Sequence, residues 1–420
     1  MERSDNRRFV GIDWATEAHQ ICVVNDRDEV LYERVVQHSG PAVAEFTDWL
    51  VSLCEGDTSR LCLAIEVPRG ALVETLMERG LVVYAINPKQ LDRFRDRHFP
   101  AGAKDDRRDA YVLATSLRTD LRCFHRIRTD EPDIIRLRNL SRLDDDLRLS
   151  LHRHCCQLRE PLQRYYPQML VLSPAANEPW IWSLLEAAPT PSAGAKLTLT
   201  HVEKVLKQHR IRRLDAQGAL EALRQPGFQL VPGTVEAASE HALMLLPHLR
   251  LLHAQRLELG RKMDSVLQQM SSAEDSESEP YQHRDVELIL SLPGVGRVVA
   301  ATMLAEASQA LGERDYHALR ASAGIAPVTP RSGKRCVISM RQGCNERLRN
   351  VMYHWSRVSI QHDVVSREHY RRLRSVGHPH GRALRGVTDR LLAVLVAMLK
   401  SGEPYDAARR HARAQTQVHS

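Results

Sequence analysis

The residues of this chain that are best suited to chemistry are two carboxylates in the run Lys104-Asp105-Asp106-Arg107-Arg108-Asp109-Ala110. Asp106 and Asp109 are three residues apart and lead into an apolar pattern of helical spacing, which would place both on one helix face, one turn apart. Carboxylates this close repel each other unless a cation lies between them, and oxygen ligands favour Mg²⁺ or Mn²⁺. A solvated charged helix face is the simpler interpretation of this run alone.

Two further carboxylates follow predicted strands. The strand Phe9–Asp13 ends on Asp13, and the nearly all-apolar strand Leu61–Glu66 ends on Glu66, as a buried parallel strand would. Taken alone, Asp13 would be interpreted as a turn residue at the end of a strand and Glu66 as a surface acid. If the strands are neighbours, however, the two carboxylates lie side by side, and the helix carrying Asp106 and Asp109 can add two more. Four such acids can hold two metal ions, which stabilise the attacking and leaving oxygens at a phosphodiester.

The elements around these acids predict an α/β N-terminal domain over residues 1–125. Three antiparallel strands come first, followed by alternating helices and strands, which is the order of a ribonuclease-H-like sheet. The remaining predicted elements are the strands Gln20–Asn25, Val30–Val36 and Val82–Ile86 and the helices Pro41–Leu53, Arg69–Arg79 and Pro88–Phe94.

These motifs resemble those of a known family. Gly11-Ile-Asp13, Ala64-Ile-Glu66 and Lys104-x-Asp106-x-x-Asp109-Ala110 are similar to the DEDD set of the insertion sequence 110 family of transposases and of the related pilin-gene invertases. The resemblance implies a RuvC-like N-terminal domain, with Asp13, Glu66, Asp106 and Asp109 as metal ligands, and a distinct C-terminal transposase domain.

The middle of the chain, residues 126–275, predicts long helices. Leucines between Ile134 and Leu162, and apolar residues between Leu249 and Met270, recur in steps of three, four or seven, which is typical of coiled-coil seams. The segment 167–233 between them is an insertion with no assigned role. Ser271–Pro280 is small, polar and acidic, and predicts a linker.

The segment 276–400 predicts a mainly helical C-terminal domain, with a basic tail over 401–420. Two apolar helices flank Pro293-Gly-Val-Gly296, a helix-hairpin-helix pattern in which Gly294 and Gly296 let the backbone approach a partner. Amides at the start of the second helix can then hold a phosphate without reading sequence, although an ordinary turn between core helices is the alternative.

A candidate nucleophile lies further along. Ser332 precedes a glycine and stands among Arg331, Lys334 and Arg335, whose charges would stabilise a developing phosphorane. Spacing alone favours a turn-capping serine. The run from Ala326-Pro327 through Ser332-Gly333 to Gly343-x-Asn345-x-x-Leu348-Arg349 nevertheless resembles the family's serine-bearing block, which implies that Ser332 is the nucleophile.

The same resemblance implies nucleic-acid contacts from Arg341, Asn345 and Arg349. The chain departs from the family here, because the usual lysine and arginine before the glycine are replaced by Met340-Arg341-Gln342. The middle segment is also longer than usual.

Composition supports a nucleic-acid partner. The 420 residues include 59 Lys and Arg against 52 Asp and Glu, which gives a net charge of +7 and a pI near 9.0. The eight cysteines show no CxxC spacing, which predicts reduced thiols in a cytoplasmic protein. No apolar run reaches the roughly 18 residues of a membrane helix, so no membrane partner is expected.

The function expected from these observations is that of a transposase or site-specific recombinase acting on donor ends and target DNA. Ser332 would attack and remain joined to the strand until exchange. The resemblance further implies a homo-oligomer, a dimer or tetramer, and in some members a structured guide RNA.

Three alternatives stay open. One is a RuvC-like junction nuclease that uses metal-activated water, and another is a non-catalytic nucleic-acid-binding protein. The third is an actin-like or sugar-kinase-like ATPase, since Gly11–Thr16 resembles a first phosphate loop, but no second Gly-rich acidic loop follows.

Overall fold

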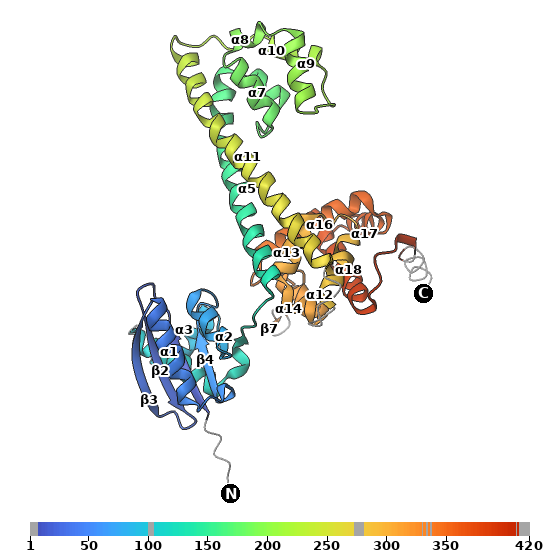
Figure 1. The fold of residues 1–420 in the computed structure, drawn as a ribbon. Coiled ribbons are helices and arrows are strands. Elements are labelled where there is room, and N and C mark those ends of the chain that lie inside the picture. The colour runs from blue at the N-terminus through green and yellow to red at the C-terminus, as the bar shows by residue number, and fades with distance from the viewer. Residues whose placement is uncertain are drawn as a thin grey trace. The chain divides into compact units, whose positions relative to one another are not determined.

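The computed structural model describes residues 7–99, 105–272, 281–329, 331–332, 335–336, 338–408 and 410. The chain divides into two compact units, Met1–Thr129 and Asp130–Ser420. The first is a mixed α/β fold and the second is largely helical, as the sequence predicts (Figure 1). Within the part of the chain that the structure describes, no helix has both the length and the apolar character needed to cross a bilayer.

The first unit is built on a six-stranded sheet of order β3-β2-β1-β4-β5-β6. The central strand β1 pairs antiparallel with β2 and parallel with β4, so the expected change from antiparallel to parallel pairing falls at β1. The sixth strand was not predicted, because it is only two residues long. The strands are β1 (Arg8–Asp13), β2 (Ala18–Asn25), β3 (Val30–Gln37), β4 (Leu61–Ile65), β5 (Val82–Ala85) and β6 (His125–Arg126).

Helices cover both faces of this sheet. Because successive side chains of a strand point to opposite faces, Val10 and Ile12 join the core under α1 (Gly40–Leu53) and α2 (Ala71–Glu78). Phe9 of β1 instead joins the core under α3 (Pro88–His98) and α4 (Asp106–Thr119). Two 3₁₀ turns, Thr58–Arg60 and Leu121–Cys123, complete the unit.

Helix α4 approaches β1 at the distance of backbone contact. A β-carbon placed on Gly11 would lie 1.9 Å from the carbonyl oxygen of Ala110 and 2.6 Å from the amide nitrogen of Ala114. Only glycine fits between the two backbones. Gly11 therefore fixes where the first turn of α4 lies along β1.

The second unit contains two long helices, α5 (Pro132–Tyr165) and α11 (Thr234–Ser272), which pack along each other in opposite directions (Figure 1). A helical module between them shares a core with the adjoining ends of α5 and α11, in which Trp180 and Trp182 are fully buried. The segment 167–233 is thus a folded module. Its helices are α6 (Pro167–Leu172), α7 (Pro179–Ala187), α8 (Pro191–Ala195), α9 (Leu199–Gln208) and α10 (Ala216–Leu223).

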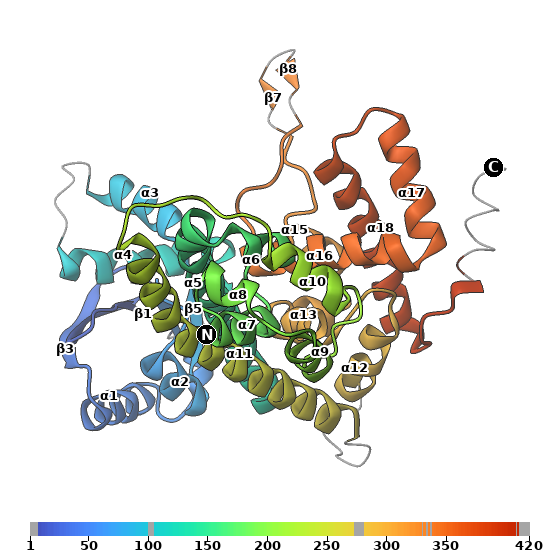
Figure 2. The same ribbon diagram turned by 90° about the horizontal axis from the view of Figure 1, so that it is seen from above.

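The remaining helices of this unit form a second core with the opposite ends of α5 and α11, centred on the fully buried Trp355. A two-stranded hairpin, β7 (Arg331–Ser332) and β8 (Arg335–Cys336), stands clear of these helices in Figure 2. The helices are α12 (Tyr281–Ser291), α13 (Arg297–Glu306), α14 (Ser308–Gly312), α15 (Tyr316–Ser322), α16 (Glu346–His362), α17 (Val364–Ser375) and α18 (His380–Ser401).

The contact between β1 and α4 predicts the effect of one methyl group. Replacing Gly11 with alanine should destabilise the first unit by about 3 kcal/mol or more, because the new β-carbon overlaps backbone atoms that cannot move independently. Hydrogen exchange of β1 and α4 amides measures this change. The matched control is Gly40→Ala, where no atom lies within 4 Å of the added carbon, and exchange there should be unchanged or slower. Equal exchange in both variants would contradict the packing account.

Candidate functional site

Two predicted site acids lie level with each other at one edge of the sheet. Asp13 is the last residue of β1, and Glu66 directly follows β4. The strands are parallel neighbours, and Ile12 pairs with Ile65, so the next residue on each strand is Asp13 and Glu66. Both side chains are partly exposed. The expected neighbourhood of the two strands is therefore confirmed.

The alternation of the strands directs both acids to the face that α4 covers. Gly11 contacts α4 and Ala64 belongs to the core beneath α4, and each is two residues before its strand's acid. Residues two apart on a strand face the same side of the sheet, about 6.6 Å apart. Asp13 and Glu66 thus share a face with the helix that carries the other two acids.

The first turn of α4 carries Asp106 and Asp109, and it is capped by Asp105, whose carboxylate accepts the Arg107 amide. Acidic residues at this end of a helix are stabilised by the helix dipole. The two acids differ in environment, because Asp106 is exposed whereas Asp109 is buried against the sheet. Their spacing predicted a shared face but not this difference in burial.

Asp109 is held by an arginine that the sequence did not single out. Arg95 of α3 donates from Nε to Asp109 Oδ1 at 2.6 Å and from Nη2 to Oδ2 at 3.0 Å, while its Nη1 reaches Asp92 at 2.7 Å. The side chains of Arg95 and Asp109 are 17% and 3% exposed. The hydrogen bonds that Arg95 donates to Asp109 raise the pKa of its guanidinium. Nothing in the sequence distinguishes Arg95 from its neighbours Arg93 and Arg97 on the same helix.

The donor set fits a divalent cation in its chemistry. Asp13, Glu66 and Asp109 offer only carboxylate oxygens, which suit hard ions. Among the residues that the structure describes, no group of three or more His, Cys, Asp or Glu is close enough to hold an ion. Each oxygen of Asp109 accepts one hydrogen bond from Arg95. Arg95 thereby supplies the positive charge that this buried carboxylate needs.

The candidate serine lies on a hairpin. The backbones of Arg331 and Ser332 pair with those of Cys336 and Arg335. At the foot of the hairpin, the amides of Val328 and Ser339 donate to each other's carbonyl oxygens at 3.0 and 2.9 Å. Gly333 and Lys334 lie outside the described residues, as do the side chains of Arg331, Ser332 and Arg335.

The two glycines of the predicted helix-hairpin-helix differ. Gly294 has φ of 80°, and a β-carbon there would lie 2.8 Å from the Ser359 amide nitrogen of α16. The neighbouring Pro293 carbonyl accepts hydrogen bonds from Trp355 and Ser359. Gly294 is therefore packed within the protein. Gly296 lies at the start of α13, where an added β-carbon would meet no described atom within 4 Å, so this position is open to a partner.

The residues after the hairpin have roles within the fold. Asn345 caps α16 by accepting the Leu348 amide at 3.1 Å, and it donates to Glu306 at 2.8 Å. Arg349 donates to the carbonyl oxygens of Arg341 and Gln342, at 3.0 and 3.1 Å. Asn345 therefore has a capping role that the sequence did not predict, and its nucleic-acid contact stays a prediction.

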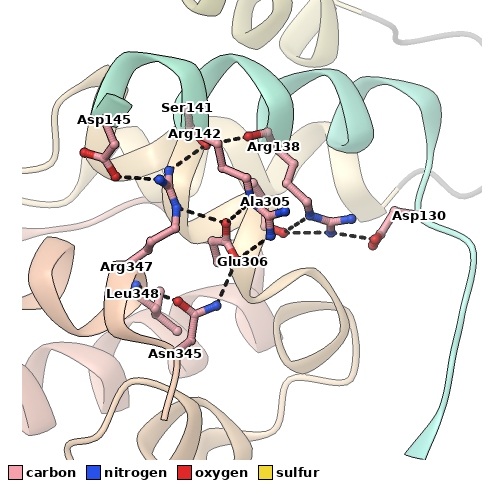
Figure 3. A network of polar contacts seen from close by, with 10 residues as sticks. All are labelled: Asp130, Arg138, Ser141, Arg142, Asp145, Ala305, Glu306, Asn345, Arg347 and Leu348. Carbon is pink, nitrogen blue, oxygen red and sulfur yellow. Dashed lines mark hydrogen bonds and ion pairs between the residues drawn. The ribbon is translucent and has the colours of Figure 1, made fainter. Parts of the chain in front are cut away.

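Glu306, at the end of α13, is the centre of a polar network that joins three helices (Figure 3). Its side chain is 4% exposed and accepts from Arg142 of α5 at 3.0 Å and from Arg347 of α16 at 3.1 Å. Burial alone would raise the pKa of Glu306, but hydrogen bonds from Arg142 and Asn345 and the charge of Arg347 lower it. The network fixes the start of α16, and with it one end of the segment that carries the hairpin.

The sheet with its edge carboxylates, joined in one chain to a helical unit, is the architecture expected of a DEDD-type transposase. Comparison with known proteins supports this class. Residues 10–167 match the transposase family model of DEDD type, and residues 286–371 match the model described as the transposase IS116/IS110/IS902 family.

Individual relatives also include proteins assigned as transposases. A mini-circle protein of Streptomyces coelicolor, assigned as the transposase for IS117, is 31% identical over 410 residues, covering 96% of each chain. Protein y4uE of Sinorhizobium fredii, assigned as a transposase, is 45% identical over 211 residues, half of this chain and 58% of that relative. The IS900 42 kDa protein of Mycobacterium paratuberculosis is 27% identical over 97% of this chain and 99% of its own length.

The chain therefore belongs to the IS110 family of transposases, which are DNA-processing enzymes. Its DEDD domain indicates dependence on a divalent metal. Residues 168–285, which include the helical module, lie outside both family models.

The pair Arg95–Asp109 predicts a metal-dependent stability. Arg95→Gln should lower the stability of the first unit by about 3 kcal/mol in EDTA, because a buried carboxylate loses its partner. Saturating Mg²⁺ should restore that loss, and the affinity for Mg²⁺ measured by calorimetry should rise. The control is Arg97→Gln, which removes an exposed ion pair of 3.6 Å on the same helix. A Mg²⁺ affinity equal in both variants would argue against competition between Arg95 and the ion.

The network around Glu306 predicts a pH-dependent effect. Glu306→Gln should cost about 2 to 4 kcal/mol at pH 7, since three donors lose a buried charge. A carboxylate of lowered pKa stabilises the fold above its ordinary pKa and loses that contribution as pH falls. The difference from wild type should therefore shrink below about pH 4 in thermal unfolding. Glu287→Gln, on the exposed side of α12, is the control. A difference that is constant with pH would exclude the charge as its origin.

Proposed function

We propose that this transposase cuts and rejoins DNA strands by metal-assisted phosphoryl transfer, with Ser332 as the nucleophile. The observation that carries the proposal is the register of β1 and β4, which sets Asp13 and Glu66 level on the face that α4 covers. Donor ends and target DNA are the substrates, since transposases act on DNA and the chain carries a net charge of +7.

The chemistry proceeds by transesterification. The Ser332 oxygen attacks the scissile phosphorus and gives up its proton, one strand end becomes a phosphoserine ester, and the other leaves as a hydroxyl. Attack by the hydroxyl of an exchanged strand then releases Ser332 and rejoins the DNA, so no water and no external energy source is consumed. Bound Mg²⁺ or Mn²⁺ ions, held by Asp13, Glu66, Asp106 and Asp109, would stabilise charge on the attacking and leaving oxygens.

The protein's own residues prepare this reaction. Gly11 brings α4 onto β1 at Ala110, directly after the turn that carries Asp106 and Asp109. Arg95 orients Asp109 by donating a hydrogen bond to each of its carboxylate oxygens. Arg331, Lys334 and Arg335 provide positive charge along the hairpin for the phosphorane. Gly296 caps the start of α13 with open space at its β-carbon position, so the first amides of α13 would offer a backbone phosphate a contact that is independent of sequence.

The finer assignments follow from the same family relationship. The first unit is a RuvC-like domain, α5 and α11 form a coiled coil, and α12 and α13 form a helix-hairpin-helix. The working enzyme is a homo-oligomer, a dimer or tetramer, whose acids and serine meet in a composite site. A structured guide RNA selects the DNA partners, as in some members of the family.

A covalent trapping experiment tests the nucleophile. Wild-type protein with Mg²⁺ and a labelled donor-end DNA should form an adduct on a denaturing gel, and peptide mapping should place the DNA on Ser332. Ser332→Ala should reduce the adduct by at least about a thousandfold, as loss of a nucleophile does. The control is Ser339→Ala, at the exposed foot of the same hairpin. Unchanged cleavage by Ser332→Ala would instead identify a nuclease that uses metal-activated water.

A further inference from the structure

Four arginines meet at the foot of the β7–β8 hairpin, and we call them the arginine site: Arg341, Arg349, Arg382 and Arg385. They come from the segment after the hairpin, from α16 and from α18. Arg349 donates to the Arg341 carbonyl oxygen at 3.0 Å, and Arg385 contacts the sulfur of Met340 at 3.5 Å. Arg382 is one turn before Arg385 on α18, and its charge acts on it.

Among the described residues, the arginine site has no counter-charge, unlike the arginines of this unit that pair with buried acids. Arg314 pairs with Asp285 at 2.5 Å, Arg256 with Asp144 at 3.0 Å, and Arg142 and Arg347 share Glu306. Within the described residues, no carboxylate lies in ion-pair distance of any member of the arginine site. The arginine site therefore gathers four guanidinium groups that no described carboxylate neutralises.

This excess of charge is also partly removed from water. Burial lowers the pKa of Arg385, and the charges of Arg382 and Arg349 lower it further. The Nε of Arg349 is buried and has no hydrogen-bond partner among the described atoms. Desolvated like charges and an unpaired buried donor both oppose folding, and a bound anion would relieve both.

The form of the side chains indicates which anion fits. Guanidinium groups present planar pairs of N–H donors that match the oxygens of a phosphate. The site lies on the segment that leads out of the hairpin carrying Ser332, so a strand engaged by that hairpin would pass its foot. A backbone phosphate has the single negative charge and the oxygen acceptors that the arginine site lacks.

We propose that the arginine site binds a backbone phosphate of the DNA strand that the β7–β8 hairpin engages, and so positions this strand for cleavage. The identity of the strand rests on the function proposed for Ser332. The family resemblance already implied nucleic-acid contacts from Arg341 and Arg349. Arg382 and Arg385 of α18 join them through the geometry and charge of the site.

The binding test uses full-length protein with the Ser332→Ala substitution, so that DNA is bound but not cut. Fluorescence anisotropy with a labelled DNA duplex, measured over a salt series, should show binding about five- to tenfold weaker for Arg385→Gln, with the salt slope smaller by about one. The control is Arg250→Gln, which removes the same charge from α11. Arg250 forms an exposed ion pair with Glu186 of α7, so its loss should change neither value. Equal losses in both variants would reduce the effect to net charge and overturn the proposal.

The unfolding temperature shows whether Arg385 binds an anion or stabilises the fold. Arg385→Gln should raise the unfolding temperature of the free protein, because it relieves repulsion among the arginines. Inorganic phosphate should stabilise wild type more than Arg385→Gln at matched ionic strength. A variant that unfolds at a lower temperature and responds to phosphate like wild type would show that Arg385 serves the fold, and the proposal would fall.

Two further experiments test whether the bound strand is DNA or RNA and whether the phosphate site depends on the role of Ser332. An RNA of the same sequence is the comparison ligand, and a loss of affinity seen with RNA alone would overturn the assignment to DNA. Trapping with Ser332 intact separates the two proposals. If no adduct forms while DNA binding still depends on Arg385, the nucleophile fails and the phosphate site stands. If an adduct forms and Arg385→Gln binds DNA like wild type, the phosphate site alone fails.

Discussion

The architecture of the first unit depends on one close contact between backbones, that of Gly11 in β1 with Ala110 in α4. The contact sets the first turn of α4 against the strand that ends in Asp13, and the parallel pairing of β1 with β4 adds Glu66 at the same level. Acids that are 53 to 96 residues apart in sequence, from Asp13 to Glu66 and to Asp109, thereby share one face of the sheet. A side chain at position 11 would separate the helix from the strand and the acids from each other.

Charge compensation is the second theme of the structure. Where a carboxylate is buried, as at Asp109 and Glu306, arginines neutralise it with two or more hydrogen bonds. The arginine site shows the reverse, with cations that have no carboxylate among the described residues. The buried acid paired to Arg95 is suited to exchange its partner for a metal ion, and the uncompensated arginines are suited to accept a phosphate. In both places a ligand of the reaction, a metal ion or a phosphate, would balance the charge of the protein.

The sequence predicted much of this fold because its signals are local. Apolar strands ending on Asp13 and Glu66, and the helical spacing after Asp106, placed the main elements within a few residues of their observed bounds. The partner of Asp109 was missed because Arg95 is one of several arginines on α3, and only tertiary packing selects it. The capping role of Asn345, the packing of Gly294 on α16 and the core that segment 167–233 shares with α5 and α11 likewise depend on contacts between residues distant in the chain.

We propose that the acids on this face of the sheet together hold a divalent ion. Anomalous scattering from crystals of the full-length protein soaked in Mn²⁺ tests it directly. We expect an anomalous peak from a Mn²⁺ ion bound by Asp13, Glu66 and Asp109, with the Arg95 guanidinium moved away from Asp109. An unbroken Arg95–Asp109 pair and no peak at saturating Mn²⁺ would contradict it.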